Sequence, residues 1–156
     1  MPHLFIGFSG IASGVGIFII VWLVVCSRTA QFTAFAFDAP GENGRFEKLL
    51  PVYLRVAEVI IGLAAGSIVL LIGSSAFRTG GQLPWFFASP LFLLAFSIIY
   101  GILFMVFVIF DYEAYRHHPD SQSYTRLKYT KNQALGFSGL FCFCVGYAWL
   151  IITVTR

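Results

Sequence analysis

The chain has 156 residues, of which 58% are hydrophobic, 18% aromatic and 11% charged, with a formal net charge of +3. A soluble domain typically has about 25% charged residues, so this composition predicts a membrane protein. Nucleic-acid binding is excluded, because the ten cations alternate with seven acids and form no dense basic stripe. Nearly all charged residues lie in two short segments, 28–58 and 111–131.

Four stretches beside these segments are long enough to cross a membrane. Residues 1–27, 59–77, 79–110 and 132–155 contain no Asp, Glu, Lys or Arg. About 20 helical residues cross the roughly 30 Å hydrocarbon core of a bilayer. The sequence therefore predicts an all-α integral membrane protein, a single domain over 1–156 built as a four-helix bundle of two helical hairpins. The predicted spans are about 4–26, 52–76, 84–110 and 134–154, and the charged connections are about 28–51 and 111–132.

Glycine pairs mark the first two spans. Gly10 and Gly14 are four residues apart in the first span, and Gly62 and Gly66 have the same spacing in the second. In lipid, small residues at this spacing let two helix backbones approach closely. We therefore expect spans one and two to pack as a tight pair. The same spacing also fits a face that pairs with a second copy of the chain.

The first charged connection contains a turn and leads into a helix. Asp38 precedes a Pro-Gly turn, so we expect a turn role for it, with a catalytic role as the alternative. Pro51 is a suitable first residue for the second span. Arg55 and Glu58 are three apart on one helix face, which predicts an ion pair or side chains that reach the headgroups. The functional alternative is a proton carrier at Glu58 or an anion site at Arg55.

The third span has an aromatic stripe with a four-residue period, which places its members on one helix face. We expect this face to pack against lipid or against a partner. A site for a flat apolar ligand, such as a quinone or a carotenoid, is the alternative, and the sequence assigns no particular cofactor. The stripe consists of Phe92, Phe96, Tyr100 and Phe104.

The second charged connection is the richest in reactive side chains. Glu113 and His117 are four apart, so they share a helix face, and Arg116 and His118 are close by. Such a group could hold a metal or act as a general acid and base. Three histidines in the whole chain are too few for the histidine boxes of membrane di-iron enzymes. We therefore expect a solvated helix end in which Glu113 and His117 pair, with no metal site.

The distribution of cations predicts the orientation. Both charged connections fall on one side of a four-span protein and carry eight of the ten cations, whereas Arg78 and Arg156 lie on the other. Under the positive-inside rule, the charged connections are cytoplasmic and both termini are outside. We expect a bacterial inner (plasma) membrane. The eight cations are Arg28, Arg45, Lys48, Arg55, Arg116, Arg126, Lys128 and Lys131.

Two classes of function fit these observations. The first is a non-enzymatic subunit, scaffold or interaction partner in a membrane complex, whose partners are membrane lipids and either other membrane-protein subunits or a second copy. The second is a small integral-membrane enzyme or carrier for a lipid or an apolar metabolite. It would use the cytoplasmic cluster of Glu113, Arg116, His117 and His118.

Overall fold

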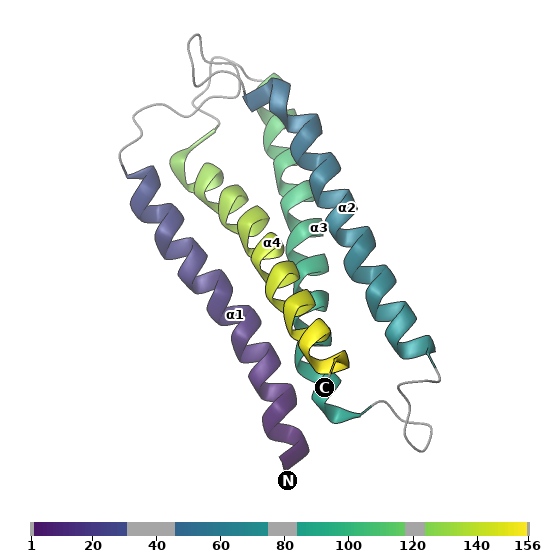
Figure 1. Ribbon diagram of the computed structural model, residues 1–156. Coiled ribbons are helices and arrows are strands. Elements are labelled where there is room, and N and C mark those ends of the chain that lie inside the picture. The colour runs from purple at the N-terminus through teal and green to yellow at the C-terminus, as the bar shows by residue number, and fades with distance from the viewer. Residues whose placement is uncertain (1, 31–45, 75–83, 118–123, 156) are drawn as a thin grey trace.

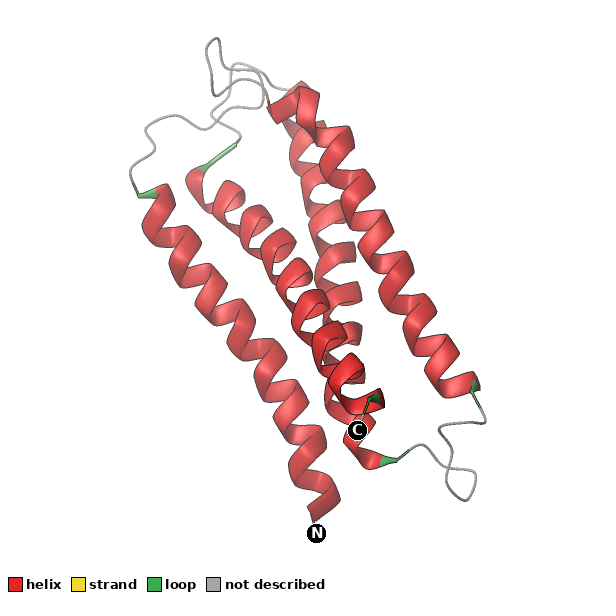
Figure 2. Ribbon diagram, viewed as in Figure 1, coloured by secondary structure: helices red, strands yellow, loops and turns green. Residues whose placement is uncertain are grey.

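The computed structural model describes residues 2–30, 46–74, 84–117 and 124–155. Its long helices are α1 (Pro2–Thr29), α2 (Phe46–Gly73), α3 (Ala88–His117) and α4 (Arg126–Val154), and the short 3-10 helix η3 (Trp85–Phe87) precedes α3. All four long helices are long and apolar enough to span a membrane, and the described residues contain no strand (Figure 2). The protein is an all-α four-helix membrane bundle.

The helices reach beyond the hydrocarbon core. At 1.5 Å per residue, helices of 28 to 30 residues are about 42–45 Å long, which matches a bilayer with its headgroup layers. Helix α2 begins at Phe46 rather than at Pro51, which lies inside it. Helix α4 begins at Arg126, where the Thr125 hydroxyl accepts a hydrogen bond from the backbone N–H of Lys128 at 3.5 Å. Both charged connections are therefore helical at their two ends.

Helices α3 and α4 form the centre of the bundle, with α1 on one side and α2 on the other (Figure 1). Helix α1 packs against both α3 and α4, whereas α2 packs along α3 and barely touches α4. Among the described residues, α1 and α2 are not packed against each other, so the predicted pairing of the first two spans is wrong. The N- and C-termini lie at one end of the bundle, opposite the end that carries the charged connections.

The glycines of α1 lie against α3. A Cβ atom at Gly10 would lie 3.1 Å from the Cβ of Phe92, and one at Gly14 would lie 2.8 Å from the Cγ of Phe96. The Tyr100 hydroxyl donates a hydrogen bond to the Gly14 carbonyl oxygen at 3.3 Å. The Phe96 ring therefore fills the space beside Gly14, and the Cβ of Phe92 with the backbone of Ser89 fills the space beside Gly10.

Most of the aromatic stripe faces the interior of the bundle, although its first residue, Phe92, is 38% exposed. Tyr100 and Phe104 are each 9% exposed, and the Phe18 ring of α1 stacks on Tyr100 with centroids 5.5 Å apart. On the other side, a Cβ at Gly136 of α4 would lie 3.2 Å from the Phe104 ring. The expectation that this face meets lipid or a partner is therefore wrong for Phe96, Tyr100 and Phe104, which pack against α1 and α4, whereas Phe92 is exposed.

The interface between α3 and α4 is the most closely packed part of the molecule. Leu93 and Leu94 are 1% and 0% exposed. A Cβ at Gly146 would lie 3.0 Å from the Cβ of Leu93. The buried Ser97 hydroxyl donates to the Gly139 carbonyl oxygen at 2.8 Å. Small residues on α4 thus bring its backbone within hydrogen-bond reach of α3.

Candidate binding site

A groove opens sideways from the bundle between α2 and α4, because these two helices barely touch. Helix α3 forms its floor, and the cavity within it has a volume of about 320 Å³. Ligand pockets in proteins range from about 300 to 1,000 Å³, so this groove is at the small end of that range. We call it the α2–α4 groove. Its residues are Val52, Tyr53, Val56, Ala57, Ile60, Ser97, Gly101, Phe104, Tyr124, Tyr129, Asn132, Gln133, Gly136, Phe137, Gly139 and Leu140.

The α2–α4 groove has a polar end and an apolar body. Helix α4 begins at the charged end of the bundle, so its first groove residues are near the headgroups. Leu140 is eight residues beyond Asn132, or about 12 Å farther along the helix. The body is lined by aliphatic and aromatic side chains from all three helices. The polar end is lined by Tyr53, Tyr124, Tyr129, Asn132 and Gln133.

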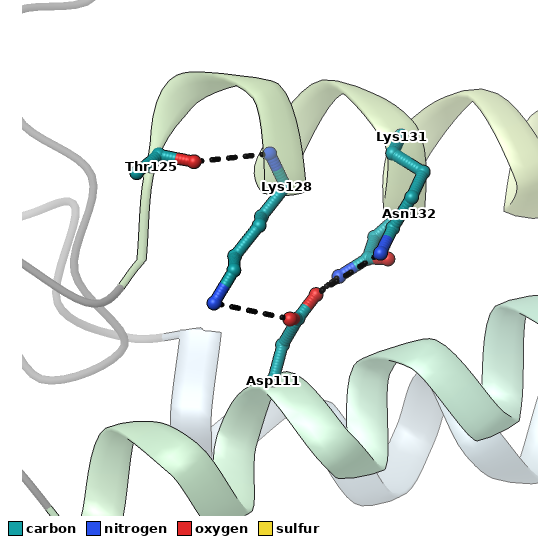
Figure 3. A network of polar contacts seen from close by, with 5 residues as sticks. All are labelled: Asp111, Thr125, Lys128, Lys131 and Asn132. Atoms are coloured by element: carbon teal, nitrogen blue, oxygen red, sulfur yellow. Dashed lines mark hydrogen bonds and ion pairs between the residues drawn. The ribbon is translucent and has the colours of Figure 1, made fainter.

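A polar network joins α3 to α4 behind this end (Figure 3). Asp111 of α3 is 8% exposed and accepts a hydrogen bond from Nδ2 of Asn132 at 2.9 Å. Its two oxygens also pair with Nζ of Lys128 at 3.6 Å and with Nζ of Lys131 at 3.7 Å. The Lys131 ammonium group lies over the Phe107 ring, 3.9 Å from its centroid. Two cations and an amide thus offset the cost of burying one carboxylate.

Asn132 connects this network to the groove. Its side chain is 2% exposed and lines the cavity. The amide nitrogen must face the Asp111 carboxylate, because a carboxylate can only accept hydrogen bonds. Its Oδ1 has no hydrogen-bond partner among the described residues. The Asn132 side chain also lies beside the Tyr124 hydroxyl. Burial raises the pKa of Tyr124 above its ordinary value, so that its phenol stays neutral.

The sequence-predicted site residues on α2 and α3 are at the surface. Arg55 and Glu58 form an ion pair at 3.2 Å with side chains that are 79% and 51% exposed. Glu113, Arg116 and His117 are exposed at the end of α3. In the part of the chain that the structure describes, no ion pair joins Glu113 to His117, so the predicted pairing is wrong. The carboxylate and the imidazole are not brought together.

Two other predicted site residues, Asp38 and His118, lie outside the described residues. Within the described ranges, no group of three or more His, Cys, Asp or Glu side chains could hold a metal ion. The network around Asp111 was missed by sequence reasoning. Its signal was the spacing of Lys128, Lys131 and Asn132, which places all three on one face of a helix.

A second groove lies between α1 and α4 and holds a cavity of about 620 Å³. Its walls are aliphatic and aromatic, and Arg28 lines its charged end. Tyr129, Gln133 and Phe137 line both grooves, so they form the ridge of α4 that separates them. This second groove has a cation but no buried polar side chain of its own.

Comparison with protein-family models, with curated proteins and with solved structures gives no match. A four-helix bundle by itself implies no particular activity, since the same fold serves many functions. Function must therefore be inferred from the chemistry of the surfaces and grooves of this chain.

Proposed function

We propose that this protein is a non-enzymatic subunit of a membrane complex and that it assembles through the outward face of α2. One observation carries the proposal. Gly62 and Gly66 are exposed, and a Cβ atom at either position would meet nothing within 4 Å. The space beside the glycine pair of α1 is filled by α3, whereas no residue in the described part of the chain fills the space beside the pair of α2.

On the outward face of α2, exposed residues repeat with the spacing of a surface that packs against another helix. Its inward face is marked by the buried residues Ala57, Ala64 and Leu71. At 100° per residue, Gly62 and Gly66 lie on the opposite side of the helix. Exposed residues on that side repeat with alternating steps of four and three, as in a coiled coil. This α2 seam consists of Arg55, Val59, Gly62, Gly66, Val69 and Gly73.

Small residues on a lipid-facing surface favour association with another helix. Apolar side chains gain nothing by leaving hydrocarbon, so helices associate in membranes through close packing and polar contacts. Three of the six seam residues are glycine and two are valine. A helix that packs here can therefore bring its backbone unusually close to that of α2.

We propose a second copy of the chain as the occupant of the seam, because two identical glycine faces related by a two-fold axis parallel to the helices can pack closely along their length. At the charged end of α2, Arg55 lies on the seam and would face Arg55 of the other copy. Each Arg55 is 79% exposed and pairs with Glu58 of its own chain at 3.2 Å, so solvent and Glu58 screen the two like charges.

Cysteine cross-linking in native membranes tests this proposal. In a variant without the three native cysteines, Val69→Cys places a thiol on the seam, and Leu70→Cys places one on the adjacent lipid-facing side. The two side chains are similarly exposed, at 69% and 74%. We expect oxidation to give a cross-linked dimer with Val69→Cys and little with Leu70→Cys. Equal yields would contradict the seam.

We further propose that the charged end of the bundle is cytoplasmic and that the membrane is a bacterial inner membrane. The support for the orientation is the cation distribution, which favours that end by eight to two. Single cysteines at positions 121 and 80 test the orientation with a reagent that does not cross membranes. We expect labelling from outside at position 80 and protection at position 121. The reverse pattern would require the opposite orientation.

A further inference from the structure

We propose that the groove between α1 and α4 binds an anionic glycerophospholipid of the phosphatidylglycerol type. The lipid phosphate lies at the Arg28 guanidinium, and one acyl chain lies along the groove. We call this surface the α1–α4 groove, and it consists of the residues that line the cavity of about 620 Å³ between these two helices. No residue of α2 lines it, so the site is independent of the α2 seam.

Two rows of side chains form the walls of the α1–α4 groove. On α1, Ile20, Val24 and Arg28 lie four residues apart and therefore on one helix face. On α4, a row from Tyr129 to Val145 repeats with the same spacing. Ile20 and Val24 are 64% and 53% exposed, so the groove is open at the side of the bundle, where the membrane lipids are. An acyl chain can enter it from the bilayer while the four helices stay packed.

The length of the groove matches one leaflet of a bilayer. Ile17 and Arg28 are its first and last residues on α1, and eleven residues at 1.5 Å each span about 16 Å. Half of the roughly 30 Å hydrocarbon core is about 15 Å. Arg28 is in the last turn of α1, at the charged end of the bundle (Figure 1). The groove therefore runs from the headgroup layer to the middle of the bilayer, which are the depths of a lipid headgroup and the end of its acyl chain.

The headgroup end of the α1–α4 groove is cationic. Arg28 lines it, and Arg126 of α4 reaches α1 at the same end, where it donates a hydrogen bond to the Cys26 carbonyl oxygen at 3.0 Å. Neither α1 nor α4 contains an Asp or a Glu. In the part of the chain that the structure describes, no carboxylate pairs with either arginine. Two guanidinium groups at headgroup depth without a counterion attract an anionic headgroup.

The chemistry of the groove selects the class of lipid. A guanidinium binds a phosphate through two parallel hydrogen bonds. The head of a phosphatidylethanolamine adds an ammonium group, and no carboxylate lines the groove to pair with it. The other two polar side chains of the groove, Tyr129 and Gln133, are hydrogen-bonded to each other at 2.7 Å. The remaining walls are aliphatic or aromatic, so they suit an acyl chain.

The first test compares two lipids on the purified full-length protein by native mass spectrometry. The probes are dioleoylphosphatidylglycerol and dioleoylphosphatidylethanolamine, which have the same chains, at equal concentration. We expect one phosphatidylglycerol per chain, retained about tenfold more strongly than the phosphatidylethanolamine. Equal retention of the two lipids overturns the anionic head.

Two variants with the same change in charge locate the headgroup. Arg28→Gln should lower the retention of phosphatidylglycerol about tenfold. Arg116→Gln is the control, because Arg116 is exposed at the end of α3 and does not line the groove. It should bind phosphatidylglycerol as the native protein does. Equal losses in the two variants would mean a general attraction of anionic lipid to the charged end, and this result overturns the site at Arg28.

A second pair of variants locates the acyl chain. Val24 and Leu23 are both exposed, at 53% and 62%, but only Val24 lines the groove. We expect Val24→Trp to fill the groove and lower the retention of phosphatidylglycerol about tenfold, and Leu23→Trp to retain it as the native protein does. Equal thermal unfolding of the two variants shows that both are folded. Unchanged lipid binding in Val24→Trp overturns the groove as the site of the chain.

Cross-linking separates this lipid site from the proposed assembly. When Val24→Trp is added to the Val69→Cys variant, the yield of cross-linked dimer should not change, because Val24 and the α2 seam lie on different helices. Failure of the lipid site and failure of the seam are therefore separate results. Loss of the dimer in Val24→Trp would show that a second copy of the chain, rather than a lipid, occupies the groove, and this result overturns the proposal.

Discussion

Helices α1 and α2 carry the same glycine spacing and use it in opposite ways. Each has 28 residues and a pair of glycines four apart, and the two flank the central pair of α3 and α4 from either side. Gly10 and Gly14 are in contact with α3, whereas Gly62 and Gly66 are exposed. A pair of small residues in a membrane helix therefore marks a surface that can pack closely against another helix. Whether it packs within the chain depends on whether another helix of the same chain faces it.

The two helices also differ in how they are attached. Helix α1 is joined to α4 near the charged end, where the Thr29 and Thr130 hydroxyls are 3.1 Å apart and Arg126 donates to the Cys26 carbonyl oxygen at 3.0 Å. Helix α2 rests on α3 through apolar residues such as Ala64 and leaves the α2–α4 groove open. We therefore expect substitutions at the α1 interface to weaken the fold, and substitutions on the outward face of α2 to weaken association only.

The largest effect is expected at Gly14. Gly14→Leu places side-chain atoms where the Phe96 ring lies, since a Cβ alone would be 2.8 Å from Phe96 Cγ. Overpacking of this kind typically costs 1–3 kcal/mol, and we expect about 3 kcal/mol here because the Phe96 ring also packs against the buried Tyr100 ring and has little room to move away. The measurement is the free energy of unfolding in detergent. Gly16→Leu is the control, because a Cβ there meets nothing within 4 Å. Similar losses in both variants would show that α1 is not held through Gly14.

The next effect concerns the α3–α4 pair on which both outer helices rest. Asp111→Ala removes the acceptor of Asn132 and both ion pairs. Hydrogen bonds to charged groups are worth about 1.5–3 kcal/mol. The two lysines are partly exposed, so their ion pairs with Asp111 contribute less to the stability. We therefore expect the free energy of unfolding to fall by about 2 kcal/mol. Glu113→Ala, two residues farther along α3 and exposed, should change the free energy of unfolding by less than about 0.5 kcal/mol. A comparable loss from Glu113→Ala would contradict the assignment of the network.

A smaller effect is expected where α1 meets α4. Thr29→Val keeps the shape of the side chain but removes the hydroxyl contact with Thr130. We expect a loss of about 1 kcal/mol in the free energy of unfolding. Ser27→Ala is the control, since the exposed Ser27 hydroxyl donates only to the Val24 carbonyl oxygen of its own helix. If Thr29→Val is as stable as the control, the hydroxyl contact does not hold α1 to α4.

The sequence was sufficient for the number and approximate location of the spans, because charge is excluded from hydrocarbon whatever the packing. It was not sufficient to predict which face of each helix is buried inside the bundle. In a membrane, an apolar side chain is stable against lipid or against protein, so hydropathy does not mark the interior. Tyr100 and Phe104 were therefore placed outside although they are 9% exposed, and α1 was paired with α2 rather than with α3.

The candidate site was harder to predict than the fold. The α2–α4 groove exists because α2 packs on α3 and leaves α4 uncovered, and no local pattern encodes that gap. Asp111 was assigned to a connection, because hydropathy ends the span before it although the helix continues to His117. Asn132 lies just before the predicted start of the fourth span at residue 134, and its spacing from Lys128 was the usable signal.

The smallest effect on stability, and the sharpest test of the contrast between α1 and α2, is expected at Gly62. Gly62→Leu adds a side chain to an open surface, where a Cβ meets nothing within 4 Å. We expect the free energy of unfolding of the detergent-solubilised monomer to change by less than about 0.5 kcal/mol.

The leucine side chain of the Gly62→Leu variant would separate two α2 helices packed at the seam. The yield of cross-linked dimer from Val69→Cys should therefore fall sharply when Gly62→Leu is added. A stability loss as large as that of Gly14→Leu would mean that this face of α2 is packed within the chain, and an unchanged cross-linking yield would mean that the glycines do not form the contact. If the monomer keeps its stability and the dimer is lost, Gly62 packs between two copies of the protein, whereas Gly14 packs within one.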